Sequence, residues 1–210
     1  SLESDKFSKT ATRIHYEAYA GKLAKLCGAL TGEVLNSVHI DSWEVGAQNW
    51  TAKLPEEFQQ RCGYSLRPYL PLLLTGCVID SVGKTERFLE DFRRTLQELL
   101  LENYFAYFRK LANNDGLELS VEAYHHLFCD TLDVHGVVDV PMSEFWVYPW
   151  SAEPTTHWYW SAKAAYSGSV VYGSPVVTAE AFTSKAKYNL SPKMLKRTGD
   201  LMFAAGVNQF

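Results

Sequence analysis

The sequence predicts an α/β fold, namely a partial (β/α)8 TIM-type barrel with parallel strands that is truncated at both ends. One observation is that apolar, β-prone runs alternate along the chain with segments of helical periodicity, as they do in βαβ units. The other is that four of these runs end in a carboxylate with an aromatic residue close behind it. In a (β/α) barrel the C-terminal ends of the strands carry the site residues. The four runs are Val38–Glu44, Leu117–Tyr124, Val140–Trp146 and Val176–Phe182.

The first part of the chain predicts a helix, a strand and two short helices. Apolar residues at helical spacing indicate a helix over residues 11–30, which Gly32 ends. The apolar run over residues 34–40 predicts the first strand. Residues 55–62 and 66–74 are predicted to form short helices, because a glycine separates them and prolines mark the start of the second.

The clearest helix spans roughly residues 85–112. Thr85 is the predicted N-cap, and the segment Asn113–Gly116 is a strong stop signal. Between them, apolar residues recur at steps of three and four, which is the spacing of one helix face. These residues are Phe88, Phe92, Leu96, Leu99, Phe105, Phe108 and Leu111.

The second half of the chain predicts two strands, 117–122 and 137–142, that are joined by a short link without a helix. A helix over residues 158–172 follows, although a glycine interrupts its pattern, and then a strand over residues 176–180. Ser191 and Pro192 have the order of an N-cap and a first helical residue, so a helix is predicted from there to about residue 205.

Residues 208–210 are predicted to begin one more strand, and the chain starts at Ser1 without a methionine. We therefore expect residues 1–210 to be a single segment of a barrel domain within a longer polypeptide. A doubly wound sheet is the competing architecture, but no glycine-rich phosphate loop follows any predicted strand.

The composition of the chain argues against nucleic acid and membranes as partners. The net charge is −4 and no basic cluster occurs, which argues against a nucleic-acid surface. No segment approaches the roughly 18 uninterrupted apolar residues of a membrane span, so no membrane partner is expected. Aromatic residues make up 14% of the chain, which indicates either a core rich in rings or a carbohydrate-binding groove.

Carboxylates at the predicted strand ends are the candidate chemical groups. Each one alone could be a salt-bridged acid, but few lysines or arginines stand nearby to neutralise them. Such a cluster either keeps one acid protonated or holds a hard cation such as calcium or magnesium. Trp43 lies between two of them, and an apolar ring favours a general acid by raising the pKa of a nearby carboxyl. The candidates are Asp41, Glu44, Glu122, Glu144 and Glu180.

Aromatic residues follow the third of these strands and form a candidate sugar-stacking wall, since ring faces pack against the C–H face of a pyranose. A satellite hydrophobic cluster is the alternative interpretation. The residues of this wall are Trp146, Tyr148, Trp150, Trp158 and Trp160.

Several motifs together resemble the catalytic barrel of the α-L-rhamnosidases of glycoside hydrolase family 106. The resemblance begins with Asp41–Gly46 and Arg61–Pro71 and covers most of the chain from about residue 35 onward. The further matching segments, in order, are Asp91–Arg93, Glu122–Tyr124, Asp139–Trp146, Ala179–Thr183 and Gly206–Asn208.

This resemblance implies an inverting glycosidase that removes terminal α-L-rhamnose from plant or microbial polysaccharides or glycosides, with a calcium ion helping to hold the sugar hydroxyls. By position, Glu44 is the implied general acid, and Glu144 and Glu180 are the two candidates for the base. The residues expected to contact the substrate are Asp41, Trp43, Glu122, Tyr124 and Trp146.

The resemblance also implies accessory β-rich domains in the same polypeptide and a periplasmic or extracellular location. Two alternatives stay open: a related glycosidase for another sugar, such as a deoxyhexoside or a uronide, or a carbohydrate-binding relative without catalysis. The presence of Glu44, Glu144 and Glu180 argues against a carbohydrate-binding relative, because binding alone needs the rings but not these acids.

Overall fold

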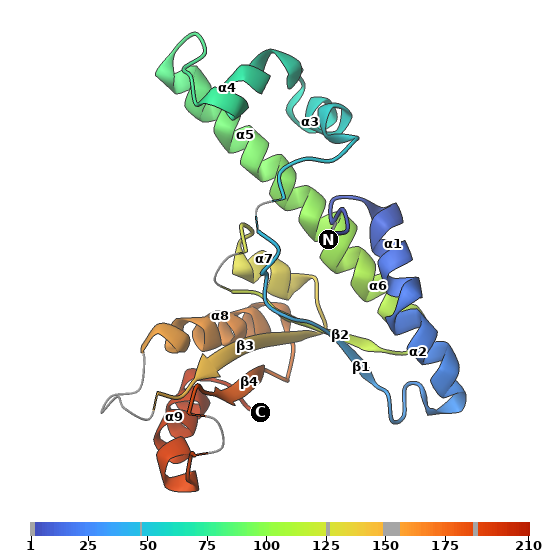
Figure 1. Cartoon of the computed structure of the whole chain (residues 1–210), viewed down its shortest axis with the longest axis vertical. Helices are drawn as coiled ribbons and strands as arrows, with labels where there is room; N and C mark the ends of the chain where they lie inside the picture. The colour runs from blue at the N-terminus through green and yellow to red at the C-terminus, as the bar shows by residue number, and fades with distance from the viewer. Residues whose placement is uncertain (1–2, 47, 125–126, 149–155, 187–188) are drawn as a thin grey trace.

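The computed structural model describes residues 3–46, 48–124, 127–148, 156–186 and 189–210. Its centre is a sheet of four parallel strands in the order β1-β2-β3-β4. Helices fill the connections between the strands, so the architecture is α/β and forms a half-barrel (Figure 1). The predicted fold class is therefore confirmed. The strands are β1 (Ser37–Ile40), β2 (Glu118–Glu122), β3 (Val140–Trp146) and β4 (Thr178–Thr183).

A long helical rod crosses the molecule beside the sheet (Figure 1). It consists of α5 (Val82–Leu100), one π-helical turn η3 (Leu101–Phe105) and α6 (Ala106–Asn114). α3 packs along its first half and α1 along its second half. The remaining helices are α1 (Lys9–Ala18), α2 (Ala20–Cys27), η1 (Gly28–Leu30), α3 (Leu54–Cys62), η2 (Arg67–Tyr69), α4 (Leu70–Thr75), α7 (Thr131–Gly136), α8 (Thr156–Tyr172) and α9 (Pro192–Ala205). None of the described helices has the length and apolar character needed to cross a membrane.

The two faces of the sheet differ in character because side chains alternate along each strand. Leu119 and Val121 of β2 and Phe145 of β3 are at most 1% exposed and belong to the apolar clusters under the helices. The alternate positions of the same strands carry Glu122 and Glu144. The face away from the helices therefore carries acidic side chains at the C-terminal ends of its strands, which is where a barrel of this kind builds its site.

Two predicted helices differ from the observed ones, the first in its middle and the second at its N-terminal end. The helix predicted over residues 11–30 is split at Tyr19, whose backbone (φ −126°, ψ −81°) leaves the helical region between α1 and α2. The prediction of Thr85 as an N-cap was wrong: Ser81 caps α5 by accepting a hydrogen bond from the Lys84 amide. Thr85 lies inside the helix and its hydroxyl bonds to the backbone of Ile79. The buried apolar pattern begins later than the helix because the first three residues of α5, Val82–Lys84, are exposed.

The link between β2 and β3 contains a helix, α7, that the sequence pattern did not reveal. It is only six residues long, and its N-cap Asp130 accepts a hydrogen bond from the Leu132 amide. α7 packs closely on α8, because a Cβ added to Gly168 would lie 2.5 Å from Cβ of His135. The glycine that weakened the prediction of α8 is therefore the position at which the two helices approach each other.

His135 is expected to make the stability of this helix contact depend on pH. Its side chain is 2% exposed, and neither ring nitrogen has a hydrogen-bond partner among the described residues. Burial lowers the pKa of His135 from its ordinary value of 6.5 to about 4. The folded chain keeps the ring neutral, whereas the unfolded chain takes up a proton below pH 6.5. The free energy of unfolding therefore keeps its full value above pH 6.5. It falls by about 3 kcal/mol as the pH decreases toward 4.

Hydrogen–deuterium exchange in the peptide covering Thr131–Gly136 tests this prediction in the full-length protein. After correction for the intrinsic rate, we expect the local opening constant to rise about twentyfold from pH 7 to pH 5. A His135→Leu variant should show a much smaller rise. If the variant keeps the full pH dependence, another group causes it.

The sheet continues beyond β4. The amide of Ala179 donates to the carbonyl of Gln209 at 3.1 Å, and an isolated parallel bridge joins Thr178 to Gln209. This is the place where the sequence predicts one more strand, but the described residues form only this single bridge.

Candidate active site

The strand register brings the predicted carboxylates to one face of the sheet. Ile40 of β1 lies opposite Val121 of β2, so Asp41 and Glu122 follow at the same level. Glu144 of β3 lies directly opposite Glu180 of β4. All four acids occupy positions that alternate with the helix-covered residues, and they therefore point to the open face of the half-barrel.

A pocket of about 450 Å³ lies over the ends of these strands. Its lining contains every residue predicted for catalysis or substrate contact except Glu122, which is 2% exposed. The lining residues are Asp41, Ser42, Trp43, Glu44, Tyr124, Glu144, Trp146, Tyr148, Trp158, Glu180 and Lys185. Residues from the ends of all four strands thus meet in one cavity, as the sequence predicts.

Glu144 is held rigidly. It is 9% exposed, and each of its carboxylate oxygens accepts a hydrogen bond, one from the Tyr124 hydroxyl and one from the Trp146 indole. Burial, followed by the bond to Glu144, raises the pKa of Tyr124 well above its ordinary value, so Tyr124 keeps its proton and donates. The two donors fix the Glu144 carboxylate in one orientation.

Glu180 is less constrained, and the backbone next to it is strained. One carboxylate oxygen accepts a 2.6 Å hydrogen bond from Thr183, and the other has no hydrogen-bond partner among the described residues. The register between β3 and β4 shifts between Glu144 and Trp146, and Phe182 adopts φ +65°. This bulge turns the Phe182 ring onto Phe145 at a centroid distance of 4.9 Å and leaves Glu180 facing the pocket. A bulky residue at positive φ costs energy and is typical of functional sites.

Glu44 and Asp41 lie on the loop that follows β1. The Glu44 side chain is exposed and, within the described part of the chain, accepts one hydrogen bond, from Ser42 at 3.2 Å. Trp43 between them is 7% exposed, and its indole donates to the carbonyl of Gly46 at 2.8 Å. The loop therefore turns back on itself around a buried ring, with the two carboxylates on the pocket side.

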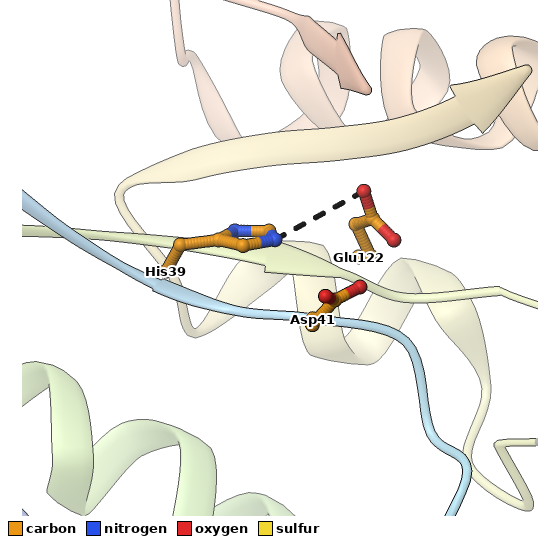
Figure 2. Close-up of side chains that lie close together, drawn as sticks. All are labelled: His39, Asp41 and Glu122. Carbon is orange, nitrogen blue, oxygen red and sulfur yellow. Dashed lines mark ion pairs between the residues drawn. The ribbon is translucent and has the colours of Figure 1, made fainter. Parts of the chain in front are cut away.

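A second cluster lies at the ends of β1 and β2, where His39, Asp41 and Glu122 face one another (Figure 2). One possible ligand atom from each residue falls within 4.8 Å of the others, and His39 Nε2 lies 4.0 Å from Glu122 Oε1. Both oxygens of Glu122 are buried without a hydrogen-bond partner among the described residues. Burial first, and then the nearby carboxylates, raise the pKa of Glu122 to about 9, while burial lowers the pKa of His39.

The cluster offers some of the oxygen donors that a hard cation would need. Two unpartnered, buried carboxylate oxygens beside a second carboxylate are the donors that calcium prefers, and a cation would relieve their repulsion. His39 is a less suitable ligand for calcium than the carboxylates, and its Nδ1 already lies 2.9 Å from the Ser120 hydroxyl. The oxygen donors Asp41 and Glu122 are the residues that would hold the ion.

The aromatic wall is present on one side of the pocket. The Trp146 ring is parallel to the rings of Tyr148 and Trp158, at interplanar angles of 19° and 13°, and Tyr124 meets Trp158 edge to face. Trp160 is 71% exposed and does not line the pocket, and Trp150 lies outside the described residues. Three of the predicted rings thus line the pocket, and the same rings belong to or pack on the apolar cluster that contains Phe145, so both interpretations of the sequence stay open.

Four residues of the site were not predicted, and one of them, Ser42, lines the pocket and donates to Glu44. His39 shares its side of β1 with Asp41, two residues later, and this spacing could have revealed it. Thr183 orients Glu180, and Lys185 is the only basic side chain among the described lining residues. The strand was predicted to end at residue 180, so Thr183, the last residue of β4, and Lys185, two residues after it, were not placed at the strand end.

A parallel half-barrel with converging carboxylates and stacked rings at its strand ends defines the class of protein, namely a glycoside hydrolase barrel. Comparison with known families agrees: the family model for glycoside hydrolase family 106, described as alpha-L-rhamnosidase, matches residues 1–210. The chain belongs to this alpha-L-rhamnosidase family.

Two relatives show how much of a family member the chain represents. It is 40% identical to a protein from Formosa agariphila with the provisional name beta-glucuronidase, and it covers 17% of that protein. It also superimposes, with a TM-score of 0.89 and 33% identity, on the solved structure of a rhamnosidase from Novosphingobium sp. PP1Y, of which it covers 20%. Both comparisons extend over 100% of this chain. The chain thus spans about a fifth of each relative or less.

Proposed function

We propose that the protein of which this chain is part hydrolyses terminal α-L-rhamnosides with inversion at the anomeric carbon. The observation that supports this most is the pocket in which Glu44 shares one cavity with Glu144 and Glu180 beside stacked rings. Inversion requires one carboxylic acid that protonates the leaving oxygen and one carboxylate that activates water from the opposite face. Glu44, on an exposed loop at the pocket rim, takes the role of acid in this proposal.

Glu180 is the better of the two candidates for the base. A general base needs a free oxygen that can accept a hydrogen bond from the attacking water. Both oxygens of Glu144 already accept hydrogen bonds from Tyr124 and Trp146, whereas one oxygen of Glu180 is free among the described residues. We therefore assign the base to Glu180, and we assign Glu144 to sugar hydroxyl binding and to holding Tyr124 and Trp146 in place.

The substrate lies, in this proposal, with its apolar face on Trp146 and Trp158 and with its hydroxyls toward Asp41 and Glu144. Tyr124 and Trp43 shape the pocket between these groups. The sequence resemblance suggests rhamnosides of plant or microbial polysaccharides or glycosides, and a periplasmic or extracellular location.

Residues 1–210 form, in this proposal, one segment of a catalytic barrel that other parts of the same polypeptide complete. The length of the relatives supports this, since the chain covers 17% and 20% of them. The outer edge of β1 has no strand partner among the described residues, and a largely apolar hollow of about 660 Å³ lies beside it. A further strand of the barrel fits this edge, and accessory β-rich domains fit the remaining length.

Release of rhamnose by the full-length protein tests the proposal. We expect hydrolysis of 4-nitrophenyl α-L-rhamnoside and weak or no hydrolysis of a panel of other aryl glycosides. Binding of oligosaccharide without turnover of any substrate in the panel would show a carbohydrate-binding relative instead of an enzyme.

A uronide substrate is the second candidate, and Lys185 is the observation that favours it. A lysine among four carboxylates in the pocket lining could pair with the carboxylate of a uronic acid, and one relative carries the name beta-glucuronidase. The panel therefore includes 4-nitrophenyl β-D-glucuronide. Preference for this substrate, with loss of that preference in Lys185→Met, would replace the rhamnoside assignment.

We also propose that the protein binds calcium through Asp41 and Glu122. The ion would supply a positive charge that fixes sugar hydroxyls next to the pocket. We expect chelator to lower activity by about tenfold or more, calcium to restore it, and Glu122→Gln to abolish the response to both. Activity that is indifferent to chelator in the wild-type protein would contradict this site.

A further inference from the structure

The loop that carries Glu44 depends on support from outside the pocket. The Glu44 side chain accepts a single hydrogen bond among the described residues, and this bond comes from its neighbour Ser42. The position of the Glu44 carboxyl is therefore set by the backbone of the loop. That backbone is fixed by Trp43, whose indole donates to the Gly46 carbonyl and whose ring packs edge-on against Phe128 at 5.6 Å.

Lys6 occupies the space against this ring. Although it is a lysine, it is only 6% exposed. Its ammonium lies 5.5 Å from the centroid of the Trp43 ring and 5.4 Å from that of Tyr104, and it donates to Glu3 at 2.8 Å. Burying a lysine is costly unless its charge is compensated, and here two ring faces and one carboxylate provide the compensation. The ammonium therefore connects the rings of Trp43 and Tyr104 through its charge as well as through packing.

The residues around Lys6 bind the same loop at two further points. The Lys6 amide donates to Gln48 Oε1 at 3.3 Å, and Gln48 Nε2 donates back to the Ser4 carbonyl at 3.2 Å. The Thr51 hydroxyl donates to Asp5 at 2.7 Å. The N-terminal segment Glu3–Phe7 thus contacts the chain that follows β1 at Trp43, Gln48 and Thr51.

The π-helical turn η3 anchors this segment to the rest of the molecule. Asn103 of that turn donates through its side chain to the Phe7 carbonyl at 2.7 Å, and its own carbonyl accepts from Thr12 at 2.8 Å. Tyr104, the next residue, provides the second ring beside Lys6. A π-helical turn inside a long helix costs hydrogen-bond geometry and commonly marks a functional position. Here it provides a continuous series of contacts from η3 through Lys6 to the loop of Glu44.

We propose that Lys6 is a positioning residue: its ammonium, held between Tyr104 and Trp43, fixes the loop Asp41–Gly46 so that Glu44 points into the pocket. The inference rests on the proposed role of Glu44 as general acid. It predicts a specific kinetic defect, because a displaced acid slows only reactions whose leaving group needs a proton.

The variants Lys6→Met and Lys6→Arg in the full-length protein test this, with Lys9→Met as a matched control. Lys9 is an exposed lysine on α1 whose ammonium lies 5.9 Å from the Tyr107 ring and has no described contact with the loop. For Lys6→Met we expect kcat on phenyl α-L-rhamnoside to fall about tenfold, and kcat on the activated 2,4-dinitrophenyl α-L-rhamnoside to change by less than about twofold. KM of Lys6→Met should stay near the wild-type value. Lys6→Arg, which keeps the positive charge, should retain most of the wild-type kcat on phenyl α-L-rhamnoside.

An equal loss on both substrates would indicate a merely structural role and would overturn the inference, as would no loss on either. Should Lys6→Met fold poorly, Thr51→Val removes one of the other contacts to the segment and should give a smaller loss of the same kind. Hydrogen–deuterium exchange in the peptide covering residues 41–51 should rise in Lys6→Met and not in Lys9→Met. No rise in Lys6→Met would also overturn the inference.

If Glu44→Gln itself shows no dependence on the leaving group, the proposed acid and this inference both fail. If it shows that dependence and Lys6→Met does not, only the inference fails.

Discussion

A Glu44→Gln variant of the full-length protein is expected to hydrolyse phenyl α-L-rhamnoside about 10³-fold more slowly than wild type. Glutamine keeps the size of the side chain but cannot donate a proton to the leaving oxygen. The same variant should lose less than about tenfold on 2,4-dinitrophenyl α-L-rhamnoside, because that leaving group departs without protonation. Steady-state kcat on the two substrates is the measurement.

Glu56→Gln is the matched control for this experiment. Glu56 is an exposed acid in the first turn of α3, outside the lining of the pocket, and its substitution should leave both rates unchanged. An equal loss on the two substrates in Glu44→Gln would assign Glu44 to binding and would leave the pocket without an identified acid.

Glu180→Gln is expected to lose about 10³-fold on both rhamnosides, regardless of the leaving group. Activation of water is needed whatever group departs. The loss of rate in this variant therefore does not depend on the acidity of the leaving group. Glu144→Gln should have a smaller effect, about tenfold to 100-fold with a raised KM, since its hydrogen bonds to Tyr124 and Trp146 orient the pocket. The comparison of kcat and KM for the two variants separates their roles.

The reverse pattern would exchange the two assignments. If Glu144→Gln lost about 10³-fold on both substrates and Glu180→Gln mainly changed KM, Glu144 would be the base. The free oxygen of Glu180 would then serve sugar binding.

Most of the fold followed from local sequence patterns. The four parallel strands and the helices α5, α8 and α9 were predicted because apolar runs and helical spacing are local properties. The end of β3 was misjudged because Ser143 and Glu144 interrupt the apolar run, although they continue the strand. α7 was missed because six residues are too few to show periodicity. In both cases tertiary packing determines the structure.

The candidate site was predictable where it depended on strand ends and not where it depended on contacts between distant segments. Asp41, Glu144 and Glu180 meet in one pocket because parallel strands bring their C-terminal ends together. The spacing of His39 from Asp41 places both on one side of β1, but the approach of His39 to Glu122 also depends on the register of β1 and β2, which the sequence does not specify. The contact of Lys6 with Trp43 joins residues far apart in the chain, and no pattern in either segment indicates it.

The stereochemistry of the first product is the most direct measurement of the central claim, which is that these carboxylates cleave α-L-rhamnosides with inversion. Proton NMR spectra recorded during hydrolysis of an aryl α-L-rhamnoside by the full-length protein distinguish the two anomers of rhamnose before they equilibrate. The account predicts that β-L-rhamnose appears first and that the α anomer follows by mutarotation. Initial release of α-L-rhamnose, or no release of rhamnose at all, would contradict it.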